Sequence, residues 1–148
     1  MLDLDSILKE WQEDCQIPQH QLDETQRHTP NLHAKYLQYL SLTKLNLKRA
    51  EHSQHKLLKD KWLYYNGKMD EHTLREKGWV PDPFDGLKVM KGDMDYYYDS
   101  DPEIQKSEEK ITYLKTIVET LTEIIDNLKW RHQTIKNIIE YRKFESGS

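Results

Sequence analysis

The sequence predicts an all-α protein in which long helices form a hairpin-like arrangement and a C-terminal heptad helix drives oligomerisation. Apolar residues recur every seven positions through the last third of the chain. Proline follows a helix-capping residue at Thr29-Pro30 and at Asp101-Pro102, a combination typical of helix starts. The 148 residues are 36% apolar and 32% charged, and the mean hydropathy is -0.97. Such polarity suits helices that bury one stripe and expose the rest.

The first 14 residues are typical of a short amphipathic helix. Asp5 or Ser6 is expected to cap its N-terminus, and Pro18 is expected to end it. Its apolar face carries Ile7, Leu8 and Trp11.

A long second helix is predicted to begin at Thr29-Pro30 and to end at Asn66-Gly67, a pair that readily adopts positive φ. Its apolar residues recur at helical spacing: Tyr36, Leu37, Leu40, Leu47, Ala50, Leu57, Leu58 and Tyr65.

Residues 79–99 predict an irregular connection with room for a short helix, because two prolines and two glycines interrupt the stretch. Asp101-Pro102 then opens the most regular segment of the chain, which runs without Gly or Pro to about Lys143. As a single helix it would span roughly 60 Å.

The last helix carries a heptad register. Its first position is mostly β-branched: Ile104, Ile111, Val118, Ile125, His132 and Ile139. Its second position is mostly leucine: Leu114, Leu121, Leu128 and Ile135. This is a coiled-coil pattern, and Ile117, Ile124 and Ile138 widen the stripe beyond a dimer seam.

We expect this stripe to pack against the helix that begins at Pro30 and also against neighbouring subunits, because the earlier helix has too few apolar positions to cover it. The predicted oligomerisation residues are Ile111, Leu114, Val118, Leu121, Ile125, Leu128, Ile135 and Ile139. Arg131 and His132 interrupt the stripe, either to set register or because the helix frays there.

Charge is segregated along the chain although the net charge is only -4. Residues 1–24 carry seven acids against one lysine, and residues 93–109 do the same. Residues 44–68 instead hold seven basic residues against two acids. This basic stretch is the candidate anion-binding segment.

The basic stretch ends in a mixture of cations and aromatic rings, the two components of sequence-tolerant single-strand binding. The candidate DNA-binding residues are Lys59, Lys61, Tyr64, Tyr65 and Lys68. On a helix Lys59 is displaced from the face that the other four share. Trp62 or Tyr65 could equally belong to the core, and the whole segment could be a solvated helix face.

The sequence lacks the residue motifs of the common catalytic and metal sites. A single cysteine excludes an intramolecular disulfide, and His52 with His55 lacks further ligands for zinc. No phosphate-binding glycine loop occurs, and the acidic residues 93–101 lack the spacing of a calcium loop. We therefore expect no enzyme activity, no metal and no other cofactor. Without a long apolar run or a basic leader, we expect a cytosolic protein that neither enters membranes nor is secreted.

Residues 58–68, Leu-Lys-Asp-Lys-Trp-Leu-Tyr-Tyr-Asn-Gly-Lys, resemble a segment of the UvsY family of T-even-like phages, in which a basic-x-basic pair precedes Tyr-Tyr-x-Gly-basic. The C-terminus resembles the family's ending in register, through Ile135-Lys136, Ile138, Arg142, Phe144-Glu145 and Gly147. With the acidic N-terminal helix and the order of the long helices, the resemblance covers most of the chain.

The resemblance implies a recombination mediator that binds single-stranded DNA and helps a phage recombinase of the UvsX type displace the phage single-strand-binding protein. It also implies a ring-like homo-oligomer of about six or seven subunits, acting without catalysis in the cytoplasm of the infected bacterial host. Recombination, replication and repair are the processes concerned. The acidic N-terminal helix is one candidate surface for the recombinase.

By resemblance, DNA binding falls on Lys59 and Lys61, and its extension to Tyr64, Tyr65 and Lys68 is our inference. The chain departs from the family pattern in having Lys61 where arginine is familiar, Asp60 between the two cations, and prolines at positions 81 and 83.

The expected division is a region 1–99 with the DNA-binding segment and a region 100–148 for oligomerisation. The alternative function is a coiled-coil adaptor without DNA affinity, which explains the heptads but leaves the basic-aromatic segment unexplained.

Overall fold

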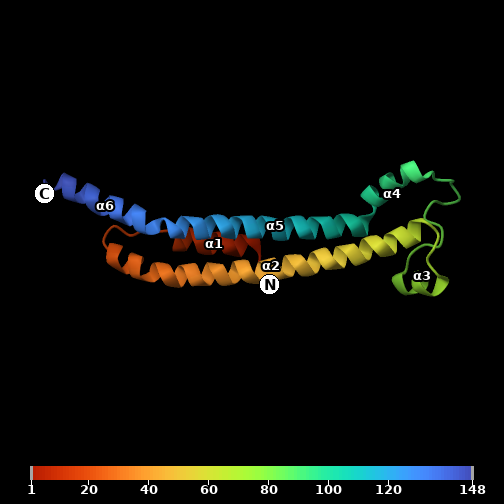
Figure 1. Cartoon of the computed structure of the whole chain (residues 1–148), viewed down its shortest axis with the longest axis horizontal. Helices are drawn as coiled ribbons and strands as arrows, with labels where there is room; N and C mark the ends of the chain where they lie inside the picture. Colours follow the sequence, from red (N-terminus) through yellow and green to blue (C-terminus); the bar gives the residue numbers. More distant parts are fainter. Residues whose placement is uncertain (1, 148) are drawn as a thin grey trace. The chain divides into compact units, whose positions relative to one another are not determined.

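The computed structural model describes residues 2–147, which contain helices and the connections between them and no strand. This confirms the predicted all-α fold. The elements in chain order are α1 (Leu4–Asp14), α2 (Leu22–Tyr65), α3 (Glu71–Lys77), the 3-10 helix η1 (Lys91–Asp93), α4 (Met94–Ser100), α5 (Pro102–Lys129) and α6 (Arg131–Glu145) (Figure 1).

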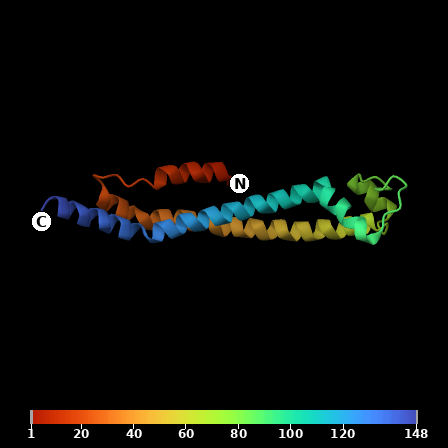
Figure 2. The same cartoon turned by 90° about the horizontal axis from the view of Figure 1, so that it is seen from above.

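The chain forms two compact units, and both long helices contribute to each. Unit 1 comprises Met1–Asn46 and Leu114–Ser148, and unit 2 comprises Leu47–Tyr113. Within each unit the segments of α2 and α5 run side by side in opposite directions, as the hairpin-like arrangement requires (Figures 1 and 2). The division expected from the sequence assigned DNA binding to residues 1–99 and oligomerisation to residues 100–148. It concerns function and stays a prediction. Residue 148 lies outside the described residues.

Helix α1 begins two or three residues earlier than the sequence suggested. Its cap is Asp3 rather than Asp5 or Ser6, and the Asp3 carboxylate accepts the Ser6 N–H at 2.7 Å. The helix ends at Asp14, before Pro18. Ile7 is fully buried, while Leu8 on the same predicted apolar face is exposed.

The core of unit 1 lies where α1 covers the α2 and α5 segments (Figure 2). Its buried members are Ile7 from α1, Tyr36 and Leu40 from α2, and Ile117, Leu121, Ile124, Ile125 and Leu128 from α5. Trp11 packs edge-to-face on Tyr36, with ring centroids 5.6 Å apart. Helix α1 thus supplies apolar cover that α2 lacks.

The predicted start of α2 at Thr29-Pro30 is wrong, because α2 begins at Leu22 and Pro30 lies inside it. Two acidic residues occupy the first turn, where their negative charges interact favourably with the helix dipole and stabilise the helix. Asp23 pairs with Arg27 at 2.9 Å, and the Thr29 hydroxyl donates to the Thr25 carbonyl one turn earlier. Thr29 therefore bonds within the helix instead of capping it, and proline costs the helix one N–H donor.

The predicted end of α2 and start of α5 are confirmed. Gly67 has φ 69°, its N–H donates to the Tyr64 carbonyl, and the Lys68 N–H donates to the Leu63 carbonyl. This is the Schellman arrangement that closes a helix on glycine. Helix α5 begins at Pro102, directly after Asp101.

The stretch 79–99 contains the short helix for which the sequence left room, namely α4, preceded by η1. Residues 71–77 form α3, a helix that was not predicted. Asp70 caps α3 through Thr73, and Gly78 ends it in the left-handed conformation.

The expected unbroken helix to Lys143 is interrupted at Trp130, which separates α5 from α6. The Arg131 guanidinium is buried and donates to the carbonyls of Asp14 (3.1 Å) and Gln16 (2.7 Å). These carbonyls lie at and just beyond the end of α1, where helical partners are missing. Arg131 interrupts the heptad stripe, and it supplies hydrogen-bond donors to the free carbonyls at the end of α1.

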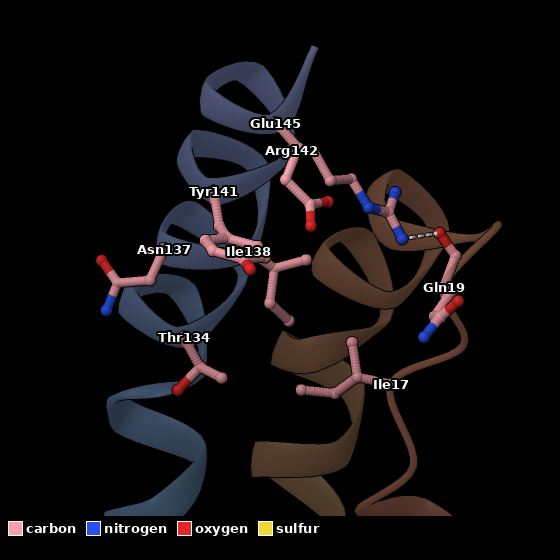
Figure 3. Close-up of a pocket in the computed structure, with 8 residues that line it drawn as sticks. All are labelled: Ile17, Gln19, Thr134, Asn137, Ile138, Tyr141, Arg142 and Glu145. Atoms are coloured by element: carbon pink, nitrogen blue, oxygen red, sulfur yellow. Dashed lines mark hydrogen bonds between the residues drawn. The ribbon is translucent and has the colours of Figure 1, made fainter. Parts of the chain in front are cut away.

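Helix α6 lies against the connection between α1 and α2. Arg142 donates to the Gln19 carbonyl, and Ile17 and Ile138 line the same shallow pocket (Figure 3). The exposed aromatic side chains of this part of the chain are Trp130, Tyr141 and Phe144.

The eight predicted oligomerisation residues are largely covered within one chain. Six of them are buried: Ile111, Leu114, Leu121, Ile125, Leu128 and Ile135. Val118 is half-buried, and Ile139 on α6 is 40% exposed. Their role between subunits stays a prediction, and Ile139 is the member best placed for it.

Candidate nucleic-acid interface

The basic-aromatic segment forms the last turns of α2 in unit 2, where helical periodicity sorts its side chains onto two sides. Lys61, Tyr64 and Tyr65 are buried. Lys59 and Lys68 are exposed. Three of the five predicted DNA-binding residues therefore lie in the interior and two lie at the surface.

Lys61 is 4% exposed. Its Nζ lies 3.0 Å from Asp101 Oδ2 and 3.4 Å from Glu103 Oε1. A buried ammonium is costly unless it is paired, and both carboxylates come from the start of α5. The same Nζ lies 3.9 Å from the centroid of the Trp79 ring. Lys61 thus has a carboxylate cage and an aromatic face as its surroundings.

Asp101 joins the two helices. Its Oδ1 accepts the N–H groups of Glu103 and Ile104 at the start of α5, and its Oδ2 accepts the Tyr65 hydroxyl at 2.6 Å. Burial alone would raise the pKa of Asp101, but the hydrogen bonds from Tyr65 and Lys61 outweigh it and the pKa is lowered. Asp101 therefore stays ionised between α2 and α5.

The two tyrosines are packed on one side and hydrogen-bonded on the other. The Tyr64 hydroxyl donates to the Val80 carbonyl at 2.6 Å, and its ring lies 5.0 Å from that of Trp79. Tyr65 packs against Phe84 and Tyr98, with ring centroids 5.9 and 5.3 Å away. These contacts fasten the connection after α3 to the end of α2.

The exposed side carries cations beside an aromatic ring. Trp62 is 47% exposed, and Lys68 Nζ lies 4.6 Å from the centroid of its ring. Asp60, which lies between Lys59 and Lys61 in the sequence, pairs with Lys77 of α3 at 3.1 Å. We call the exposed residues Lys59, Trp62 and Lys68 the outward basic face. It offers charges for phosphates and one ring for a base.

The family model described as "Recombination, repair and ssDNA binding protein UvsY" matches residues 10–148. The chain belongs to the UvsY family. The fold is also that of crystal structures of the bacteriophage T4 recombination mediator protein UvsY. In lattice type II the identity is 23% and the TM-score 0.82, over 99% of both chains. In lattice type I these values are 23% and 0.79, over 95% of this chain and 98% of that one. No curated protein matches the chain.

The interior position of Lys61 in this UvsY-family chain could have been read from spacing. Lys61 follows Leu57 by four residues and Ala50 by eleven, so it continues the buried stripe of α2. Sequence reasoning missed that Asp101, recognised as a helix cap, is also the partner of Lys61. No local pattern links residues 40 positions apart.

Other kinds of site find little support in the described residues. Among residues 2–147, no three His, Cys, Asp or Glu side chains are grouped to hold a metal ion. His52 and His55 are exposed on α2. No described helix combines the length and apolar character needed to cross a membrane.

The lowered pKa of Asp101 predicts an acid-dependent contribution to stability. Because the folded-state pKa lies below the ordinary 3.8, ionised Asp101 stabilises the fold above that value, and the stabilisation is lost as pH falls through the folded-state pKa. Asp101→Asn should therefore be less stable than wild type near neutral pH, and the difference should shrink below about pH 4. Urea unfolding at a series of pH values measures this. A difference independent of pH would contradict the ionised pair.

Proposed function

We propose that this UvsY-family chain is a recombination mediator that binds single-stranded DNA through the outward basic face. It promotes loading of a UvsX-type phage recombinase onto strands covered by the phage single-strand-binding protein. The observation that carries the proposal is the family match over residues 10–148. The processes are homologous recombination and recombination-dependent replication and repair, in the cytoplasm of the infected bacterium.

In this proposal the five sequence-predicted DNA residues have two different roles. Lys59 and Lys68 contact phosphates, and the partly exposed Trp62 offers a stacking surface for an unstacked base. Lys61, Tyr64 and Tyr65 position the segment through Asp101 and the connection after α3. Such a surface has no donors or acceptors arranged to read bases, so binding is tolerant of sequence.

The proposal includes a ring-like homo-oligomer of about six or seven subunits. Each outward basic face has few cations, so a single subunit binds weakly. Several such faces on one ring raise the effective concentration for one strand without any new contact. Binding alone holds the strand where the recombinase can load, so no chemical step on the DNA is needed.

The proposal predicts stimulation of recombinase assembly. The assay uses single-stranded DNA that is first covered by the single-strand-binding protein. Adding the wild-type protein should shorten the lag before the recombinase hydrolyses ATP on this DNA. Lys59→Ala/Lys68→Ala should lose most of this stimulation, because its strand affinity falls about tenfold or more. Lys88→Ala/Lys91→Ala, at two exposed lysines outside the face, is the matched control. A wild type that assembles but leaves the ATPase unchanged would favour the adaptor alternative.

A further inference from the structure

A groove on unit 2 lies between α2 and α5 and has a volume of about 590 Å³. Ala50 and Leu57 of α2 form its apolar part, while Ser53 and Ser107 are too short to fill the space between the helices. Leu57 is only half-buried, so its side chain borders the open space. The groove therefore offers apolar surface that the described chain leaves uncovered.

The rims of this α2–α5 groove are basic on both sides. Lys106 and Lys110 line it from α5. On α2, Arg49 and Lys56 flank Ser53 at spacings of four and three residues, which places them beside it on the helix surface. All four are exposed. None of them takes part in the ion pairs found between residues 2 and 147.

The one acid that lines the groove is already engaged. Glu103 Oε1 accepts the Trp79 indole N–H at 2.7 Å and lies 3.4 Å from Lys61 Nζ. Lys61 also pairs with Asp101 at 3.0 Å, so Glu103 keeps part of its negative charge at the groove. The four unpaired cations outnumber this one acid, so an occupant with several carboxylates is favoured.

We propose that the α2–α5 groove binds an acidic peptide segment of a partner protein, with one or two large apolar side chains seated on Leu57 and Ala50. Charge complementarity argues for an acidic occupant, and the aliphatic floor argues for a protein. A nucleic-acid strand fits this groove less well, because its lining contains no aromatic ring on which bases could stack. An amphipathic peptide meets both demands at once: its apolar face fills the floor and its carboxylates reach the rims.

The interaction is independent of the outward basic face. Protein partner and DNA strand would occupy different surfaces of unit 2, so one subunit could hold both. This gives a mediator a physical means of keeping a partner close to the strand.

The test uses a fluorescein-labelled peptide of about fourteen residues, rich in Asp and Glu, with Leu, Leu and Phe at i, i+3 and i+7. Anisotropy with the full-length protein should show binding that weakens about tenfold or more in Lys106→Glu/Lys110→Glu. Lys88→Glu/Lys91→Glu carries the same charge change outside the groove and should bind within about twofold of wild type. Ser53→Leu, which fills the groove at constant charge, should also weaken binding.

Three results would overturn the proposal. A peptide with serine in place of its apolar anchors could bind equally well, which would mean attraction to charge alone. Ser53→Leu could lower the oligomer mass in light scattering, which would assign the groove to a second copy of the chain. Lys106→Glu/Lys110→Glu could weaken the binding of an oligonucleotide as much as that of the peptide, which would assign the groove to DNA. Failure of wild type to bind the oligonucleotide would instead count against the proposed function.

Discussion

Lys61→Met is expected to lower the free energy of unfolding by about 3 kcal/mol or more, although lysine is usually a surface residue. Removing the ammonium leaves Asp101, which is 3% exposed, without its charge partner. A buried carboxylate without a counter-charge is far less stable than the pair. Urea unfolding followed by circular dichroism measures the loss.

Two companion variants separate position from charge. Lys61→Arg keeps a cation next to Asp101 and should retain most of the stability, and arginine is the residue familiar at this position in the family. Lys59→Ala removes an exposed charge two residues away and should change stability by less than about 0.5 kcal/mol. If Lys61→Met were as stable as Lys59→Ala, Lys61 would not be held as the structure describes.

Leu121→Asp is expected to unfold much of the subunit, not merely to separate subunits. Leu121 is fully buried in the unit 1 core, among α1, α2 and α5. Losing its apolar contacts and burying a carboxylate should together cost at least about 4 kcal/mol, a large part of the stability of an ordinary domain. Far-ultraviolet circular dichroism at room temperature should show reduced helix content.

Ile139→Asp is the matched substitution for assembly, because Ile139 is 40% exposed on α6. It should leave the helix content near that of wild type and lower the oligomer mass in light scattering. A folded Ile139→Asp variant with unchanged mass would show that subunits meet elsewhere.

The sequence predicted best those features that depend on a few adjacent residues. Asp101-Pro102 marked the start of α5, and Asn66-Gly67 marked the end of α2, because a cap and a positive φ are local demands. Thr29-Pro30 carried the same local signal but lies inside α2. There the acidic residues Asp23 and Glu24 begin the helix earlier, and the loss of one donor at proline is tolerated.

The features that depend on distant residues were not predictable in the same way. The heptad stripe was correctly read as apolar, but α1 covers part of it, and only the fold shows that cover. For the candidate site, the sequence grouped the cations in the segment that ends α2, and their role in DNA binding stays a prediction. The spacing of Lys61 after Leu57 could have placed it in the interior, but its pairing with Asp101 could not be predicted, because no local pattern links residues so far apart along the chain.

DNA binding by the outward basic face through phosphates can be measured directly. The direct measurement is the affinity for a fluorescent oligonucleotide across a range of salt concentrations, for wild type and for Lys59→Ala/Lys68→Ala of equal oligomer mass. We predict that log Kd rises steeply with log salt for wild type and that the variant loses roughly 1.4 units of slope for each subunit engaged. Equal slopes and affinities for the two proteins would contradict the claim.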